Sequence, residues 1–211
     1  FILFMLPTNG GEALVVIAAI LFELALPLTP AQVLWINMVT SSTLGLALAF
    51  EPAEPGIMNR RPRPPGAALL SGFFVWRVLM VSVLMMTGAL GLFLWELDAG
   101  TSIETARTMA VNAVVTAEMF YLINSRFILS SVLSREGMTG NRYVLLAIAV
   151  CIPLQIAYTH TPFMQAVFGS TDLSPTEWGK VLAAGLLVFS LAELEKFIMR
   201  RTRLAARLVH A

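Results

Sequence analysis

The sequence predicts an all-α membrane protein, a polytopic bundle of six transmembrane helices. Of its 211 residues, 57% are hydrophobic and 13% are charged, whereas soluble domains carry about 25% charged residues. The apolar residues form long runs, and a helix needs roughly 20 mostly apolar residues to cross a bilayer. We therefore expect the lipid bilayer as a partner and no nucleic acid.

The first two expected spans lie close to the start of the chain. The first covers about residues 1–26 and stops at "PLTP", and the second covers about residues 31–50. The stretch "EPAEPGIMNRRPRPPG" at 51–66 follows them. Because it is polar and rich in proline, it is expected to be a loop between spans.

Four further apolar runs complete the expected bundle, which covers residues 1–199 as one transmembrane domain. A short turn, "DAGTS", and a polar segment, "SREGMTGNR", separate three of them, and "DLSPTEW" is a helix-start signal before the last. The chain ends in a basic tail at 200–211. The four runs are about 68–97, 104–124, 143–158 and 178–199.

Arginine and lysine predict the orientation, because positive residues concentrate in cytoplasmic loops. With six spans, one side holds the 51–66 loop, the 125–142 loop, and the end of the last helix with the tail. The basic residues of these regions are Arg60, Arg61, Arg63, Arg126, Arg135, Arg142, Lys196, Arg200, Arg201, Arg203 and Arg207. The other side holds Arg107 and Lys180, with acids at Glu96, Asp98, Glu104, Asp172 and Glu177. We expect both chain ends to be cytoplasmic and the protein to lie in the plasma membrane.

Two acidic residues, Glu12 and Glu118, are expected deep inside the membrane, whereas most other acids fall at helix ends that water or headgroups can solvate. A charge at the bilayer centre costs about 2.5–3.5 kcal/mol on insertion scales. Such a residue persists where it faces the bundle interior and finds partners there. The simplest interpretation is that each is protonated, or hydrogen-bonded between helices for packing.

The neighbours of Glu12 favour a binding role instead. Asn9 and Glu12 are three residues apart and so share one helix face. Gly10 and Gly11 remove side chains beside them, and Pro7 removes a backbone donor one turn earlier. These residues predict either close helix approach or local unwinding that frees carbonyl oxygens.

Two other helices are expected to add oxygens. Asn37, Thr40 and Ser41 stand at i, i+3 and i+4 and share a face of the second helix. Glu118 has no polar neighbour on its own face, so its partner must come from another helix; that face also holds Val111, Val114, Val115 and Leu122. Amide, hydroxyl and carboxylate oxygens suit Ca²⁺, Mg²⁺, Na⁺ or K⁺.

Several motifs occur in a familiar order: "NGGE", "LWINMVTS", "VVTAEMFYLINS", "DLSPTEW" and "ELEKFIMRR". The ordered set resembles the C-terminal transmembrane region of a type II P-type ATPase of the sarcoplasmic-reticulum calcium-pump kind. The resemblance implies that the six expected spans correspond to transmembrane helices five to ten of a ten-helix pump. It also implies that the cation ligands are Asn9, Glu12, Asn37, Thr40 and Glu118.

The same resemblance implies that the parent is a cation-transporting ATPase and that this chain is a piece of it. The phosphorylation motif "DKTGT" and the nucleotide-binding region of the family are absent from the sequence. ATP and Mg²⁺ would therefore act only through domains outside this chain, which alone could not hydrolyse ATP. The expected partner is the N-terminal part of the pump, with the first four helices and the cytoplasmic domains.

One position departs from the family pattern. Calcium pumps of this kind carry an aspartate after the threonine of the second helix, where this chain has Ser41. At an effective dielectric of about 20, one charge against a divalent ion ~4 Å away is worth on the order of 8 kcal/mol before desolvation. We expect Ser41 to offer one neutral oxygen, in a site for a single Ca²⁺, for a monovalent Na⁺ or K⁺, or for protons.

Two other functions stay open at the level of sequence. A six-helix secondary cation transporter could use Glu12 and Glu118 as a proton or sodium relay. Inverted repeats would support it, and the sequence shows none. The third function is a non-catalytic membrane fragment with a structural role.

Overall fold

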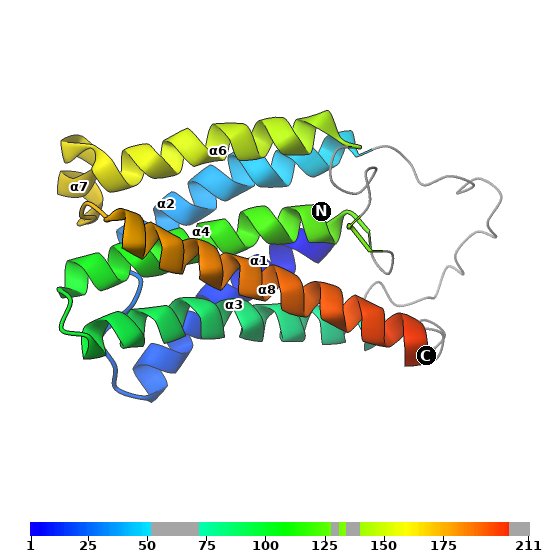
Figure 1. The fold of residues 1–211 in the computed structure, drawn as a ribbon, viewed down its shortest axis with the longest axis horizontal. Coiled ribbons are helices and arrows are strands. Elements are labelled where there is room, and N and C mark those ends of the chain that lie inside the picture. The colour runs from blue at the N-terminus through cyan, green and yellow to red at the C-terminus, as the bar shows by residue number, and fades with distance from the viewer. Residues whose placement is uncertain (52–71, 128–130, 134–139, 203–211) are drawn as a thin grey trace.

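The computed structural model describes residues 1–51, 72–127, 131–133 and 140–202 (Figure 1). Within these residues every regular element is helical, and the long helices run side by side as a bundle. The expected all-α membrane bundle is confirmed. Most of the loop expected at 51–66 and of the tail expected at 200–211 lies outside the described residues.

The elements follow one another in a simple order. The second helix changes its winding near its middle: α2 continues as the π-helix η1 and then as the short 3-10 helix η2. A short helix, α7, lies in the connection expected at 159–177. The bounds are α1 Ile2–Leu21, α2 Pro30–Thr40, η1 Ser41–Gly45, η2 Leu48–Phe50, α3 Gly72–Asp98, α4 Ile103–Ser125, α6 Arg142–His160, α7 Pro162–Phe168 and α8 Pro175–Thr202.

By length and composition, four helices within the described residues can cross a membrane: α1, α2 with its continuation to Phe50, α3 and α6. Helices α4 and α8 carry more polar residues. At 23 residues, α4 is about 34 Å long, which exceeds a hydrocarbon core of about 30 Å. The assignment of six spans stays a prediction.

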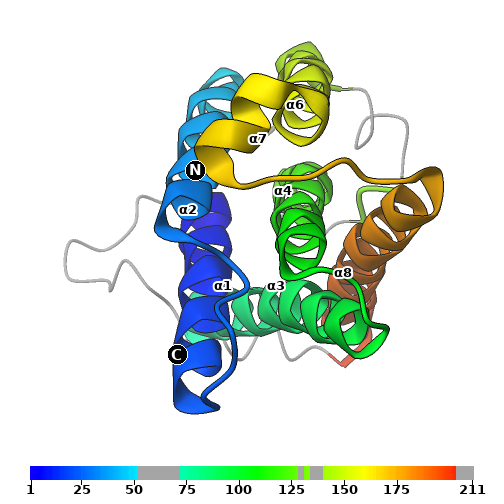
Figure 2. The same cartoon turned by 90° about the vertical axis from the view of Figure 1, so that its left-hand side faces the viewer.

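Helix α4 lies in the middle of the bundle, with the other long helices around it (Figure 2). It contacts α1, α2, α3, α6 and α8. Its residues from Thr108 to Glu118 are buried without a break. A helix enclosed by protein needs no continuous apolar surface toward lipid, which explains why α4 can hold polar side chains.

The connection between α1 and α2 starts earlier than the sequence suggests. Helix α1 ends at Leu21, and Glu23 adopts a positive φ of 54°. At the other end, the Thr29 hydroxyl accepts from the Gln32 backbone N–H at 3.3 Å, while the Gln32 side chain accepts from the Thr29 N–H at 3.0 Å. This reciprocal cap fixes where α2 begins.

The two glycines of α1 let this helix approach α3 closely, and they do not unwind it. Helix α1 is continuous through Pro7, Gly10 and Gly11. A Cβ atom built on Gly11 would lie 2.8 Å from the Met85 Cβ of α3, and one on Gly10 would collide with the Ser82 hydroxyl. The backbone of α1 therefore rests directly on α3.

Pro7 leaves a gap in the hydrogen bonds of α1, and α4 fills it. Proline has no N–H, so the Leu3 carbonyl four residues earlier loses its helical donor. The Tyr121 hydroxyl donates to that carbonyl at 3.0 Å. The Ser82 hydroxyl donates to the Pro7 carbonyl at 2.9 Å. Two neighbouring helices thus hold the segment just before Glu12.

The expectation that acids near helix ends are solvated is wrong for two residues. Glu96 is 2% exposed and accepts from Lys180 Nζ at 2.6 Å. Glu193 is 8% exposed and accepts from the fully buried Lys196 at 2.8 Å. Each buried acid has a basic partner from α8, and the positive charge offsets the loss of hydration.

The glycine contact predicts a difference between two alanine substitutions. Gly11→Ala should destabilise the bundle by about 1–3 kcal/mol, because the added methyl overpacks the α1–α3 contact. Gly91→Ala on α3 is the matched control, since a Cβ there meets nothing within 4 Å. Unfolding of the purified protein in mixed detergent micelles measures both. Equal midpoints for the two variants would contradict the tight contact.

The Tyr121 bond predicts a second effect. Tyr121→Phe should cost about 1–3 kcal/mol, because it leaves the buried Leu3 carbonyl without a donor. Tyr143→Phe is the control, since its hydroxyl pairs with Arg142 at the surface. In a Pro7→Ala background the helix regains an N–H for Leu3, so the cost of Tyr121→Phe should shrink. A cost unchanged by Pro7→Ala would mean that the hydroxyl acts elsewhere.

Candidate functional site

A hydrogen bond between α1 and α2 joins two of the expected site residues. The Asn37 amide nitrogen donates to Glu12 Oε2 at 2.8 Å and to the Val33 carbonyl at 3.0 Å. Glu12 is 4% exposed. Because the amide nitrogen is occupied, the Asn37 amide oxygen is the end that remains available as a ligand.

Glu118 brings α4 to the same place. Its side chain is fully buried, interacts electrostatically with Glu12 and lies beside Thr40. Within the described residues, neither Glu118 carboxylate oxygen has a hydrogen bond of good geometry, and neither does Glu12 Oε1. Three buried carboxylate oxygens are thus left with capacity to bind.

Among the residues that the structure describes, no basic side chain forms an ion pair with these two acids. In the described part of the chain, four buried or half-buried bases form ion pairs at other places: Arg77 with Glu195, Arg126 with Glu51, Lys180 with Glu96 and Lys196 with Glu193. A fifth half-buried base, Arg107, donates to the Leu26 carbonyl at 2.9 Å. Two like charges buried together are unfavourable unless a positive charge joins them. The arrangement is suited to protons or a metal cation.

The remaining expected ligands lie at the edge of this cluster. Asn9 is exposed, and with Glu12 and Asn37 it lines a cavity of about 380 Å³ between α1 and α2. Ser41 is half-buried and follows the buried Thr40 directly. The three helices therefore bring Glu12, Asn37, Thr40 and Glu118 together, with Asn9 at the outer side of the group. Ser41 is next to this group along the chain, and its place among the ligands stays a prediction.

The winding of the second helix changes at this point. Ser41 to Gly45 form the π-helix η1, and the Thr43 hydroxyl donates to the Val39 carbonyl at 2.6 Å. π-Helical turns occur often at functional sites. Nothing in the sequence predicts this turn, since its residues fit an ordinary helix.

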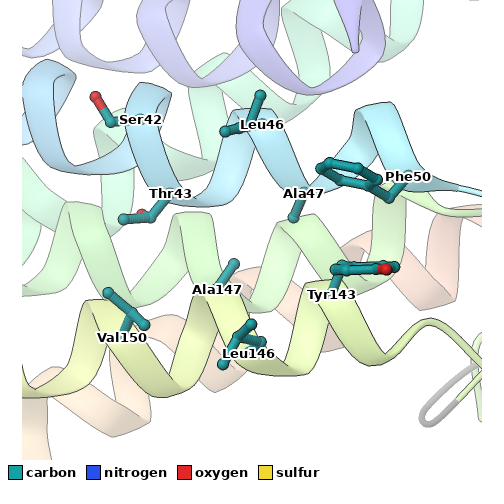
Figure 3. Close-up of a pocket in the computed structure, with 9 residues that line it drawn as sticks. All are labelled: Ser42, Thr43, Leu46, Ala47, Phe50, Tyr143, Leu146, Ala147 and Val150. Carbon is teal, nitrogen blue, oxygen red and sulfur yellow. The ribbon is translucent and has the colours of Figure 1, made fainter.

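A separate cavity of about 240 Å³ lies between η1, η2 and α6 (Figure 3). Its lining is largely apolar, and the rings of Phe50 and Tyr143 stack at one end with centroids 4.5 Å apart. It contains no carboxylate and none of the predicted ligands. This cavity is therefore separate from the group formed by Glu12, Glu118, Asn37 and Thr40.

Sequence reasoning missed one neighbour of the cluster. Cys151 of α6 is fully buried. It also interacts electrostatically with Glu118 and lies beside Thr43. Within the described residues no three His, Cys, Asp or Glu side chains gather as a metal cluster, so a bound cation would depend on neutral oxygens as well.

Comparison with known proteins places this helical bundle in a family. The profile described as "Cation transporting ATPase, C-terminus" matches residues 25–198. The "Probable cation-transporting ATPase F" of Mycobacterium tuberculosis (strain ATCC 25618 / H37Rv) is 42% identical over 200 residues, which are 95% of this chain and 22% of the relative.

Two further relatives show the same coverage pattern. "Cation-transporting ATPase pma1" of Synechocystis is 37% identical over 84% of this chain and 20% of the relative. "Calcium-transporting ATPase" of Bacillus subtilis is 28% identical over 94% of this chain and 22% of the relative. The chain spans about a fifth of the length of these relatives. It belongs to the family of cation-transporting ATPase C-terminal regions, which form part of the membrane region of P-type ATPases.

Proposed function

We propose that this chain is the ion-binding membrane part of an ATP-driven cation pump. The main observation behind this proposal is the pair of buried acids, Glu12 and Glu118, which meet between three helices. Within the described residues, neither acid has a basic partner. Asn37 and Thr40 add neutral oxygens beside them. The names of the relatives, cation-transporting and calcium-transporting ATPases, support transport as the purpose of this cluster.

The proposed cargo is a single Ca²⁺ or a monovalent cation, Na⁺ or K⁺. Carboxylate, amide and hydroxyl oxygens are hard ligands that suit these ions. Ser41 contributes at most a neutral oxygen where calcium pumps carry an aspartate, so the cluster has two acids. Two carboxylates balance one divalent ion, and a second divalent ion would lack charge compensation.

The rest of the pump would supply what this chain lacks. We propose that ATP and Mg²⁺ bind to domains outside these residues, since the relatives are about five times longer. The cavity beside Asn9 opens on the outer side of α1 and α2, where a helix from another part of the pump could close the site. The proposed location is the plasma membrane, with both chain ends in the cytoplasm.

Transport would follow from a difference in cation affinity between two arrangements of the helices. A ligand shifts a conformational equilibrium only by as much as its affinities for the two states differ. The cluster joins α1, α2 and α4, so moving one of them changes the number of oxygens around the ion. A six-helix secondary transporter receives no support from the relatives, which are named as ATPases.

Charge removal at the cluster gives the main test. In the full-length protein that contains this chain, Glu12→Gln and Glu118→Gln should each raise the cation concentration needed for phosphoenzyme formation on the order of tenfold or more. The reason is that a buried cation loses a charged partner. Phosphorylation from ATP across a panel of Ca²⁺, Na⁺ and K⁺ concentrations measures the effect and also identifies the ion.

Glu104→Gln is the matched control for this test. It removes a carboxylate from the same helix, α4, at an exposed position in the first turn. Its cation dependence should equal that of the unchanged protein. If the two buried-acid variants kept the same dependence as the control, the assigned ligands would be wrong.

Ser41→Asp gives a second test. It restores the acid of the calcium-pump pattern beside Thr40, so apparent Ca²⁺ affinity should rise by about tenfold or more. Ser42→Asp, one residue along at an exposed position, is the control and should leave the affinity unchanged. The same phosphorylation assay measures both. An unchanged Ca²⁺ affinity in Ser41→Asp would place Ser41 outside the site.

A further inference from the structure

An apolar groove lies between α3 and α8, away from the cation cluster. It has a volume of about 440 Å³, within the range of small-molecule pockets. Its walls are mainly Trp76, Met80 and Leu84 of α3 with Leu191, Leu194 and Ile198 of α8. The two helices lie side by side along this length (Figure 1). Trp76, Leu194 and Ile198 are about half exposed, so the groove opens outward.

The length of the groove matches half of a bilayer. Along α8 it runs from Leu191 to Thr202, which is about 16 Å at 1.5 Å per residue. One leaflet of a hydrocarbon core of about 30 Å is about 15 Å deep. Trp76 lies at the end near Thr202, where an indole fits the boundary between hydrocarbon and headgroups. The groove therefore has the size and position for one acyl chain of a single leaflet.

Positive charge gathers at the same end. Arg200 and Arg201 occupy the last turn of α8. Arg201 stands three residues after Ile198 and lies over the Phe197 ring at 5.0 Å, beside the groove lining. Arg77 pairs with Glu195, a residue of the groove wall, and Trp76 donates to the same carboxylate at 3.3 Å. With Lys196 and its partner Glu193, the described residues at this end include four basic and two acidic side chains. A negatively charged headgroup would complement it.

We infer that the α3–α8 groove binds an anionic phospholipid, with an acyl chain along the apolar wall and the phosphate near Arg201. Burial of the acyl chain and attraction between the phosphate and the basic residues act together at the site. A basic residue near a membrane surface attracts anionic lipid by about 1 kcal/mol, and the apolar groove fixes where the lipid stays. The inference does not depend on the identity of the transported cation.

Lipid retention tests the site directly. The full-length protein that contains this chain is reconstituted in vesicles of equal phosphatidylglycerol and phosphatidylcholine with identical acyl chains. After mild detergent extraction, native mass spectrometry counts the lipids that stay bound. We expect a preference for phosphatidylglycerol of about fivefold or more, weakened by added salt because salt screens charge. Equal retention of the two lipids would overturn the inference.

Two variants and their controls locate the site. Ile198→Trp should fill the groove and displace the bound phosphatidylglycerol, and Arg201→Gln should reduce its preference about fivefold. Leu187→Trp, exposed on α8 outside the groove, and Arg142→Gln, exposed at the start of α6, should change neither. The assigned site would be overturned if a control variant lowered phosphatidylglycerol retention as much as the groove variant it is paired with. So would an undiminished preference in either groove variant.

Discussion

Two carboxyl groups enclosed in the bundle set the constraint that the rest of the structure meets. Lipid offers no hydrogen bonds, so an ionisable side chain at this depth must face protein and find its partners there. Glu12 and Glu118 do so because α1, α2 and α4 converge on one another. The Asn37 amide fixes one carboxylate oxygen at 2.8 Å. The other three oxygens stay open to a cation or to protons.

The pairing of acids with bases elsewhere in the described bundle differs from what is found at Glu12 and Glu118. Ion pairs such as Glu96 with Lys180 and Glu195 with Arg77 lie toward the ends of the helices, where each acid meets a base. Removing one member of such a pair leaves an uncompensated buried charge. In the centre, two acids face each other instead. A structural role alone would be met more simply by an acid and a base, as it is at the ends.

The sequence was informative where local pattern decides the outcome. Long apolar runs predicted the helices, and residue spacing grouped Asn9 with Glu12 and Asn37 with Thr40. The sequence pattern could not predict contacts between residues that are far apart along the chain. The hydroxyl that pairs with Leu3, the bases that accompany Glu96 and Glu193, and the π-turn after Thr40 depend on which helices meet and at what height. For the same reason α1 ends at Leu21, where the chain turns toward the cap of α2, although the apolar run continues to Leu26.

The bond from Tyr121 to Leu3 constrains how the helices can move. Sliding α1 along α4 would strip a backbone carbonyl of its donor in a medium that supplies no replacement. The glycine surface of α1 also packs closely against Ser82 and Met85 of α3. We therefore expect helices α1, α3 and α4 to move together. The seam between α1 and α2 is bridged by a side-chain bond and bordered by a cavity, so it is the line along which displacement meets least resistance.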